Sequence, residues 1–242
     1  MNLKCTAIIL RLIRHTDHQD ILDVYTRERG RLSVLIKYRA ERKKAYRNSI
    51  FRPLNIVALE ITISGRSGLS KLISAESVYP FHQLQMDVYK SSICMFLCEC
   101  LYHAMREETA NQPLFDYLEA SLKWLEQAGR KQTANFHIVF LMRLTRFIGI
   151  YPNLEGYKKG VWFDMTESNY TPQKPWQGSY LEPSETAWLP LLSRMSYSNL
   201  HRFKLSRSGR IRILELLILY YRIHLPGFPI PQSFSILQEL FE

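Results

Sequence analysis

The side chains best suited to chemistry are concentrated in one basic run near the N-terminus. Residues 37–47, KYRAERKKAYR, hold six Lys or Arg against one acid, with Tyr38 and Tyr46 interleaved. Cations at this density neutralise phosphates, and tyrosine rings stack on bases, so the pattern is typical of a nucleic-acid contact. An ordinary solvated loop has a similar composition, and the run alone does not distinguish the two.

The overall charge supports the binding interpretation. The 242 residues carry 32 Lys+Arg and 22 Asp+Glu, a formal net charge of +10, with an isoelectric point near 9.5. Fifteen of these cations and only seven of the acids fall in residues 1–79. A surplus placed in this way predicts a polyanionic partner for the N-terminal third. The expected nucleic-acid contacts are Arg27, Arg29, Arg31, Lys37, Tyr38, Arg39, Arg42, Lys43, Lys44, Tyr46 and Arg47.

A second group of reactive side chains, His15, Asp17, His18 and Asp20, falls within six residues. Two His and two Asp suit a divalent metal, and a metal-dependent nuclease is the hypothesis that follows from them. The group lies where a turn between strands is expected, and Asp is favoured in turns for backbone reasons. We therefore expect no metal at this turn.

The cysteines form a third group, on a predicted helix. Cys94, Cys98 and Cys100 lie close together with His103 nearby, but no second pair of ligands accompanies them. Structural zinc sites draw paired ligands from two segments, so buried free thiols are expected instead.

Motifs for nucleotide binding, metalloproteases and serine hydrolases (GxGxxG, GxxxxGK[ST], HExxH, GxSxG) are absent from the sequence. These absences favour a binding protein over an enzyme, with no cofactor and no small-molecule substrate.

The elements that position these residues change character at Pro80. Before it, five short apolar segments alternate with period two and no long helix intervenes, which predicts a small five-stranded barrel of the oligonucleotide-binding (OB) type. The expected strands are 6–13, 21–26, 32–36, 56–64 and 71–79. We therefore expect an α+β protein with an OB-type barrel over 1–80 and a helical domain over 81–242.

Beyond Pro80 the apolar period is 3.6 residues, as in amphipathic helices. Helices are expected over 87–107, 113–127, 133–147, 210–225 and 232–241, the fourth of them buried. Between the third and fourth, residues 153–183 are rich in Gly, Pro and aromatic residues, and short strands or an ordered loop are predicted there. No apolar run reaches the ~18 residues that span a bilayer and no signal peptide is recognisable, so the cytoplasm is the expected compartment, with no membrane partner.

Three stretches resemble the RecO family of recombination mediators: residues 8–44, 52–81 and 140–154. The first carries the family's apolar strand, acidic turn, glycine and basic loop. The second carries its "GxLxxLxxAE…PF"-like run, and the third its "LGhxPxL"-like helix end, where h is apolar. The matching residues of the first two stretches are Asp20, Ile21, Tyr25, Thr26, Gly30, Leu32, Lys37, Arg39, Gly68, Leu69, Leu72, Ala75, Glu76, Pro80 and Phe81.

The resemblance implies a function that agrees with the charge distribution. RecO-like proteins bind single- and double-stranded DNA and anneal complementary strands in the bacterial cytoplasm. They help to load recombinase onto DNA coated by single-strand-binding protein (SSB), together with a RecR-like partner and without nucleotide hydrolysis. An RNA-binding OB-fold protein, ribosome-associated or RNA-processing, is the alternative.

Two further expectations concern the helical part. Many family members carry paired zinc-ligand cysteines after the third helix, but residues 153–183 contain no cysteine, so zinc is not expected. We predict that Trp162, Phe163 and Trp176 hold this insertion together by packing.

The family binds the acidic SSB tail on its helical domain, and Arg143 and Arg146 are the candidates for that contact, although both could be ordinary surface arginines. A second basic cluster, of open function, comprises Arg202, Lys204, Arg207, Arg210 and Arg212.

Overall fold

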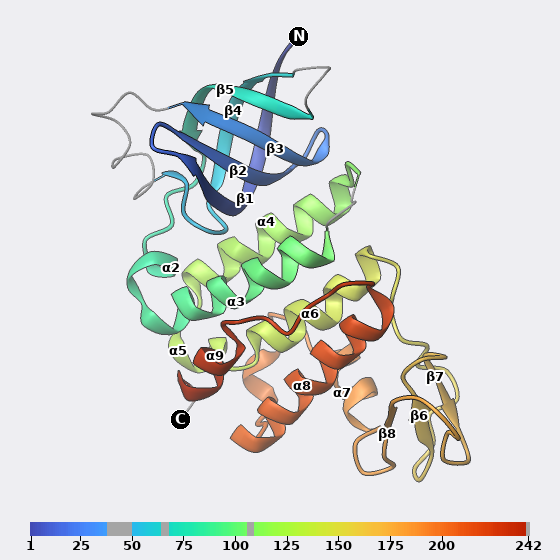
Figure 1. Cartoon of the computed structure of the whole chain (residues 1–242). Helices are drawn as coiled ribbons and strands as arrows, with labels where there is room; N and C mark the ends of the chain where they lie inside the picture. Colours follow the sequence, from blue (N-terminus) through green and yellow to red (C-terminus); the bar gives the residue numbers. More distant parts are fainter. Residues whose placement is uncertain (38–49, 64–67, 106–108, 241–242) are drawn as a thin grey trace. The chain divides into compact units, whose positions relative to one another are not determined.

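The computed structural model describes residues 1–37, 50–63, 68–105 and 109–240 (Figure 1). The chain forms two compact units, Met1–Gln127 and Ala128–Glu242. The first unit contains the barrel and three helices, and the second contains the remaining helices and a small sheet. The boundary between the two compact units, after Gln127, therefore lies later in the chain than Pro80, where the apolar periodicity changes.

The first unit is built on a closed barrel of five strands in the order β1-β2-β3-β5-β4, as the sequence predicts. All neighbouring strands pair antiparallel except β3 and β5, which pair parallel. Closure leaves no unpaired sheet edge, the usual weakness of small sheets. The strands are β1 (Asn2–Thr16), β2 (Gln19–Thr26), β3 (Gly30–Lys37), β4 (Ile56–Thr62) and β5 (Leu69–Ser77).

The barrel interior follows from alternation along each strand. Successive side chains of a strand point to opposite faces, so every second apolar residue enters the barrel. Ile9, Val24 and Val34 are fully buried there, as are residues of β4 such as Val57 and Ile61. Each such side chain contributes about 1.5–3 kcal/mol when it leaves water. β1 runs further than expected, to Thr16.

Three helices complete the first unit: α2 (Gln83–Met86), α3 (Val88–Ala104) and α4 (Gln112–Gln127). The carboxylate of Asp87 caps α3 by accepting hydrogen bonds from the amides of Tyr89 and Lys90. Cys94, Cys98 and Cys100 are buried free thiols on α3, which confirms the prediction for them. Burial raises the pKa of Cys98 to about 12, so this thiol stays protonated and unreactive at neutral pH.

The second unit combines helices with a three-stranded sheet in the order β7-β6-β8. The long helix α8 is buried along much of its length, as predicted, and Phe136 and Phe140 of α6 are fully buried. The helices are α5 (Arg130–Thr133), α6 (Phe136–Phe147), α7 (Trp188–Arg194), α8 (Arg207–His224) and α9 (Phe234–Leu240), with a short 3-10 turn, η2 (Leu200–Arg202). The strands are β6 (Trp162–Asp164), β7 (Asn169–Thr171) and β8 (Tyr180–Leu181).

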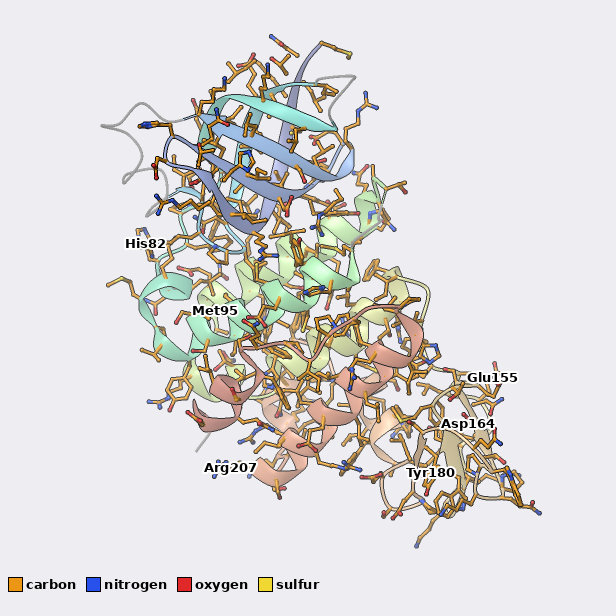
Figure 2. The ribbon with its side chains drawn as sticks, in the orientation of Figure 1. His82, Met95, Glu155, Asp164, Tyr180 and Arg207 are labelled. Carbon is orange, nitrogen blue, oxygen red and sulfur yellow. The ribbon has the colours of Figure 1, made fainter. Side chains whose placement is uncertain are left out.

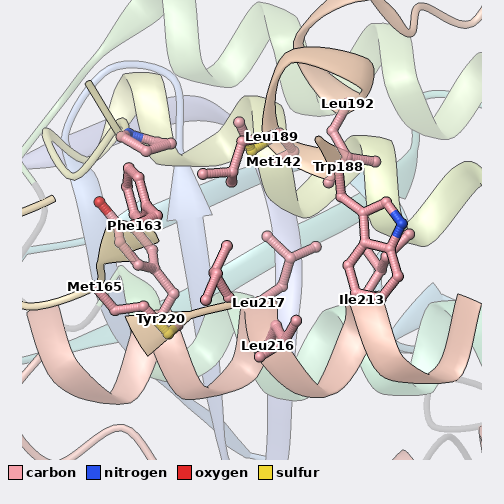
Figure 3. Close-up of a pocket in the computed structure, with 12 residues that line it drawn as sticks. Met142, Phe163, Met165, Trp188, Leu189, Leu192, Ile213, Leu216, Leu217 and Tyr220 are labelled. Carbon is pink, nitrogen blue, oxygen red and sulfur yellow. The ribbon is translucent and has the colours of Figure 1, made fainter. Parts of the chain in front are cut away.

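The small sheet packs on α8 through a compact apolar cluster, drawn in Figure 3. Phe163 is buried there, as predicted, beside Tyr220 of α8, whereas Trp162 is only partly buried. The prediction for Trp176 is wrong, because its side chain is 96% exposed. Trp176 belongs to the loop between β7 and β8, and Leu181 and Met165 take the core positions instead.

In the part of the chain that the structure describes, no helix is both long and apolar enough to cross a bilayer.

Candidate nucleic-acid interface

The outer surface of the barrel has two parts, of which one is covered by helices of the same unit. Arg31 lies in the covered part. Its Nη1 donates to the carbonyl of Tyr102 on α3 at 2.7 Å, and its guanidinium lies 4.3 Å from the centre of the Tyr102 ring. Its Nη2 is 3.6 Å from Oδ2 of Asp23, a buried carboxylate on β2. Arg11 lies against the same tyrosine ring at 5.0 Å.

Arg27 makes a similar set of contacts with α4. Its two terminal nitrogens lie 2.6 Å from Asp116 Oδ1 and 2.6 Å from Glu119 Oε2, and its guanidinium is 4.6 Å from the centre of the Phe115 ring. A guanidinium paired with two carboxylates attracts phosphate weakly, because its charge is already balanced. We therefore expect Arg27 and Arg31 to contribute little to the nucleic-acid surface, because both join the barrel to its helices.

The other described members of the predicted set, Arg29 and Lys37, are exposed but far apart. Arg29 lies in the turn before β3, and Lys37 is the last residue of that strand. At about 3.3 Å per residue, the strand separates them by roughly 23 Å. The two cations therefore do not form one patch. The remaining predicted contacts lie outside the described residues: Tyr38, Arg39, Arg42, Lys43, Lys44, Tyr46 and Arg47.

Lys37 borders the uncovered part of the barrel, which we call the open barrel face. Cross-strand pairing places Ile13 beside Ile21, Ile21 beside Leu35, and Leu35 beside Lys71. Paired residues point to the same side of a sheet, so these four form one row across β1, β2, β3 and β5. The three aliphatic side chains are partly exposed and Lys71 is exposed. The open barrel face is thus an apolar row with a lysine at one end, and Lys37 lies two residues beyond Leu35 along β3, on the same side.

The electrostatics of the open barrel face differ from those of the covered part. Among the described residues, neither Lys37 nor Lys71 forms an ion pair with a carboxylate. Their charge is therefore available to an external anion. Lys71 is not among the contacts expected from the sequence, although its strand alternation and its position shortly after the turn glycine Gly68 are visible there. In the sequence, the basic run 38–47 follows directly after Lys37, the last residue of β3.

The His and Asp group at the first turn lacks the geometry of a metal site. Asp17 forms an ion pair with Arg14, and Asp20 is buried within β2. Within the described ranges, no three His, Cys, Asp or Glu side chains come together to ligate a metal. The sheet over β6–β8 is held by the apolar cluster around Phe163, and residues 153–183 contain no cysteine.

The candidate partner residues on α6 both make contacts within the second unit. Arg143 donates to the carbonyl of Met195 at 3.1 Å, and Arg146 donates to the hydroxyl of Tyr151 at 2.9 Å. Neither contact involves a carboxylate, so both guanidinium charges remain uncompensated by these bonds. The neighbouring Met142 lines a small apolar cavity that also includes Leu189 and Leu217 (Figure 3).

The basic cluster at the start of α8 is partly engaged. Arg212 pairs with Glu185 at 2.8 Å and with Glu215 at 3.6 Å, and Arg210 donates to the carbonyl of Leu205 at 2.8 Å. Arg207, labelled in Figure 2, is exposed on the first turn of the helix. The charge of Arg212 is therefore balanced by two carboxylates.

Comparison with known proteins identifies the chain's relatives. A family model described as Recombination protein O N terminal matches residues 1–81, and one described as Recombination protein O C terminal matches residues 85–159. The DNA repair protein RecO of Phocaeicola vulgatus is 44% identical over 238 residues, 98% of each chain. Those of Bacteroides fragilis and Porphyromonas gingivalis are 40% and 34% identical, covering 99% and 98% of each chain. Barrel, charge and relatives agree: the chain belongs to the RecO family of DNA repair proteins.

Proposed function

We propose that this protein binds single- and double-stranded DNA, anneals complementary strands, and helps to load recombinase onto SSB-coated DNA with a RecR-like partner. The observation that carries the proposal is the open barrel face of a RecO-family barrel, where Lys37 and Lys71 lack carboxylate partners among the described residues. The basic run after Lys37 adds five further Lys or Arg next to it in the sequence.

The proposed binding mechanism is electrostatic. Each phosphate that a lysine or arginine neutralises releases a condensed counterion, which is favourable at low salt and weakens as salt rises. Partly exposed side chains such as Ile13 and Leu35 supply an apolar surface for bases, and Tyr38 and Tyr46 supply rings on which bases stack. Binding of this kind is indifferent to base sequence, as a repair protein requires.

Annealing follows from the same charge. Two complementary strands repel one another through their phosphates, and a cationic surface that contacts both lowers that repulsion. The bases then pair without any bond being made or broken in the protein. We accordingly propose a non-enzymatic role, without nucleotide hydrolysis or cofactor, in the bacterial cytoplasm where chromosomal DNA is repaired.

The proposed contact with the acidic SSB tail remains on α6. Such a ligand needs cations beside an apolar surface. Arg146 is exposed, and its bond to Tyr151 leaves further N–H donors of the guanidinium unused by that contact. Arg143 is partly buried and tied to Met195, so it is expected to contribute less than Arg146.

The experiment that tests the function is a strand-annealing assay with SSB-coated DNA. We expect the protein to anneal complementary strands coated with intact SSB, and to lose this ability when the SSB lacks its acidic tail. Bare strands, which carry no SSB, should anneal as well. Failure to anneal bare strands would contradict the proposed DNA function, whereas equal annealing with intact and tailless SSB would contradict only the proposed partner.

The residues on α6 are tested in the same assay. Arg146→Glu should reduce annealing of SSB-coated strands and leave annealing of bare strands unchanged. Lys158→Glu reverses another exposed cation of the second unit and serves as the matched control. Equal behaviour of the two variants would exclude Arg146 from the tail contact.

A further inference from the structure

The small sheet of the second unit displays a combination of aromatic rings and a cation on its outer face. Trp162 and Tyr180 point to the side opposite Phe163, and their rings meet edge to face with centres 5.2 Å apart. The ammonium of Lys174 lies 5.0 Å from the Tyr180 ring and 5.8 Å from the Trp162 ring. A cation close to two aromatic rings is attracted to both, which favours this arrangement of the three side chains.

The same loop carries the most exposed aromatic side chain of the sheet. Lys174 and Trp176 both belong to the β7–β8 loop, residues 172–179, and the Trp176 indole is 96% exposed. Tyr180, at the end of this loop, is labelled in Figure 2. From residue 168 to residue 181 the chain contains no Asp or Glu. The loop therefore offers a large flat ring next to a positive charge, and residues 168–181 add no negative charge.

A backbone hydrogen bond ties the base of the loop to the residue after β6. The amide of Met165 donates to the carbonyl of Ser179 at 3.0 Å. Gly178 has a φ of +87°, and a Cβ there would lie 2.9 Å from Oγ1 of Thr166, so a larger residue does not fit without movement. Pro175 fixes the backbone immediately before Trp176. The indole is thus presented to solvent by an anchored loop, at a reduced entropic cost for binding.

We propose that the β7–β8 loop is a second single-strand contact, in which a DNA base stacks on Trp176 and a neighbouring phosphate meets Lys174. The inference rests on the proposed DNA-binding function and adds a site in the second unit that the charge distribution did not indicate. Stacking requires an exposed ring, and backbone tracking requires cations beside it; this loop supplies both within three residues. The exposed amides of Gln173 and Gln177 can donate to base edges or phosphates.

Two acids flank this site: Asp164, which pairs with Tyr180 across the sheet, and Glu182. Oδ1 of Asp164, on the same face as Trp162, already accepts the amides of Thr166 and Glu167. A hydrogen bond to Tyr180 raises the pKa of Lys174, with a smaller contribution from Glu182, so the lysine is charged throughout the neutral range. A protein partner could also use an exposed tryptophan, but apart from its two prolines the loop around Trp176 consists of Gln, Lys, Gly and Ser.

The test compares base-bearing and abasic strands. The full-length protein and its variants are titrated with a fluorescein-labelled oligo(dT) strand and with an abasic strand of the same length. Trp176→Ala should weaken binding to oligo(dT) about tenfold, within the range for loss of one stacked base, and leave the abasic strand unaffected. Trp176→Phe should restore most of the affinity. Ile230→Ala, which removes another exposed apolar side chain of this unit, should bind like the wild type.

Indole fluorescence gives an independent readout. Oligo(dT) should quench the wild-type protein and quench Trp176→Phe clearly less. Unchanged oligo(dT) affinity in Trp176→Ala, or an equal loss on both strands, would overturn the base contact. A wild-type protein that binds neither strand would contradict the proposed DNA function itself. Thermal unfolding checks that the variant is folded. Because the indole is exposed, Trp176→Ala should unfold at the wild-type temperature, and this result would exclude misfolding as the cause of a loss.

Discussion

The covered part of the barrel and the open barrel face both carry cations, but among the described residues only those of the covered part are paired with carboxylates. Arg27 and Arg31 are balanced by carboxylates on β2 and α4 and lie against aromatic rings. Lys37 and Lys71 extend from strands of the same barrel without such partners among the described residues. The first pair stabilises the fold, and the second pair is available to a ligand. Counting charges in the sequence therefore overestimates the number of cations available for binding, because some of them are paired with carboxylates in the fold.

The largest expected effect comes from the covered part. Arg31→Ala should lower the free energy of unfolding by about 2–4 kcal/mol, because Asp23 would be left buried without its cation and the Tyr102 carbonyl without its donor. Urea unfolding followed by circular dichroism measures this change. DNA affinity, measured well below the unfolding transition, should stay at the wild-type value. A stable Arg31→Ala protein with weakened DNA binding would reverse the assignment of this residue.

The open barrel face should respond in the opposite way. The double variant Lys37→Ala/Lys71→Ala should bind single-stranded DNA about tenfold more weakly, with its dependence of log affinity on log salt reduced by about 1.4. Its unfolding free energy should match the wild type, because both side chains are exposed. Fluorescence anisotropy at several salt concentrations provides both numbers. Lys4→Ala, an exposed lysine on β1 outside the open barrel face, is the matched control.

A smaller effect is expected at Arg27. Its side chain is 31% exposed, so the ion pairs with Asp116 and Glu119 are partly screened by water. Arg27→Ala should cost about 1 kcal/mol of unfolding free energy. A double-mutant cycle with Glu119→Gln isolates the pairwise contribution, expected at roughly 0.5–1 kcal/mol. A coupling of zero would show that the contact observed here adds nothing to stability.

The smallest effect is expected at Arg29. This arginine is exposed, but the length of β3 separates it from Lys37. Arg29→Ala should change single-strand affinity by less than about threefold, because a distant cation acts only through a screened field. Anisotropy titration at 0.15 M salt measures it. A loss as large as that of the Lys37/Lys71 double variant would extend the DNA path to the other end of the strand.

The sequence predicts the architecture of this protein better than its surface. Period-two alternation fixes which residues of β1–β5 enter the barrel, because a slip of one residue would expose every apolar side chain. The partners of Arg27 lie about ninety residues away in the chain, and no local pattern indicates such pairs. Trp176 shows the same limit: its aromatic character suggested core, but a short loop between Pro175 and Gly178 leaves it in water.

The salt dependence of single-strand binding tests the central claim most directly. We predict that changing Lys37, Arg39, Arg42, Lys43 and Lys44 together to alanine lowers the slope of log affinity against log salt by about 3.5, at about 0.7 per phosphate contact. Affinity at low salt should fall in parallel, with the protein still folded. A slope equal to that of the wild type would contradict the account, because the DNA backbone would then be held elsewhere.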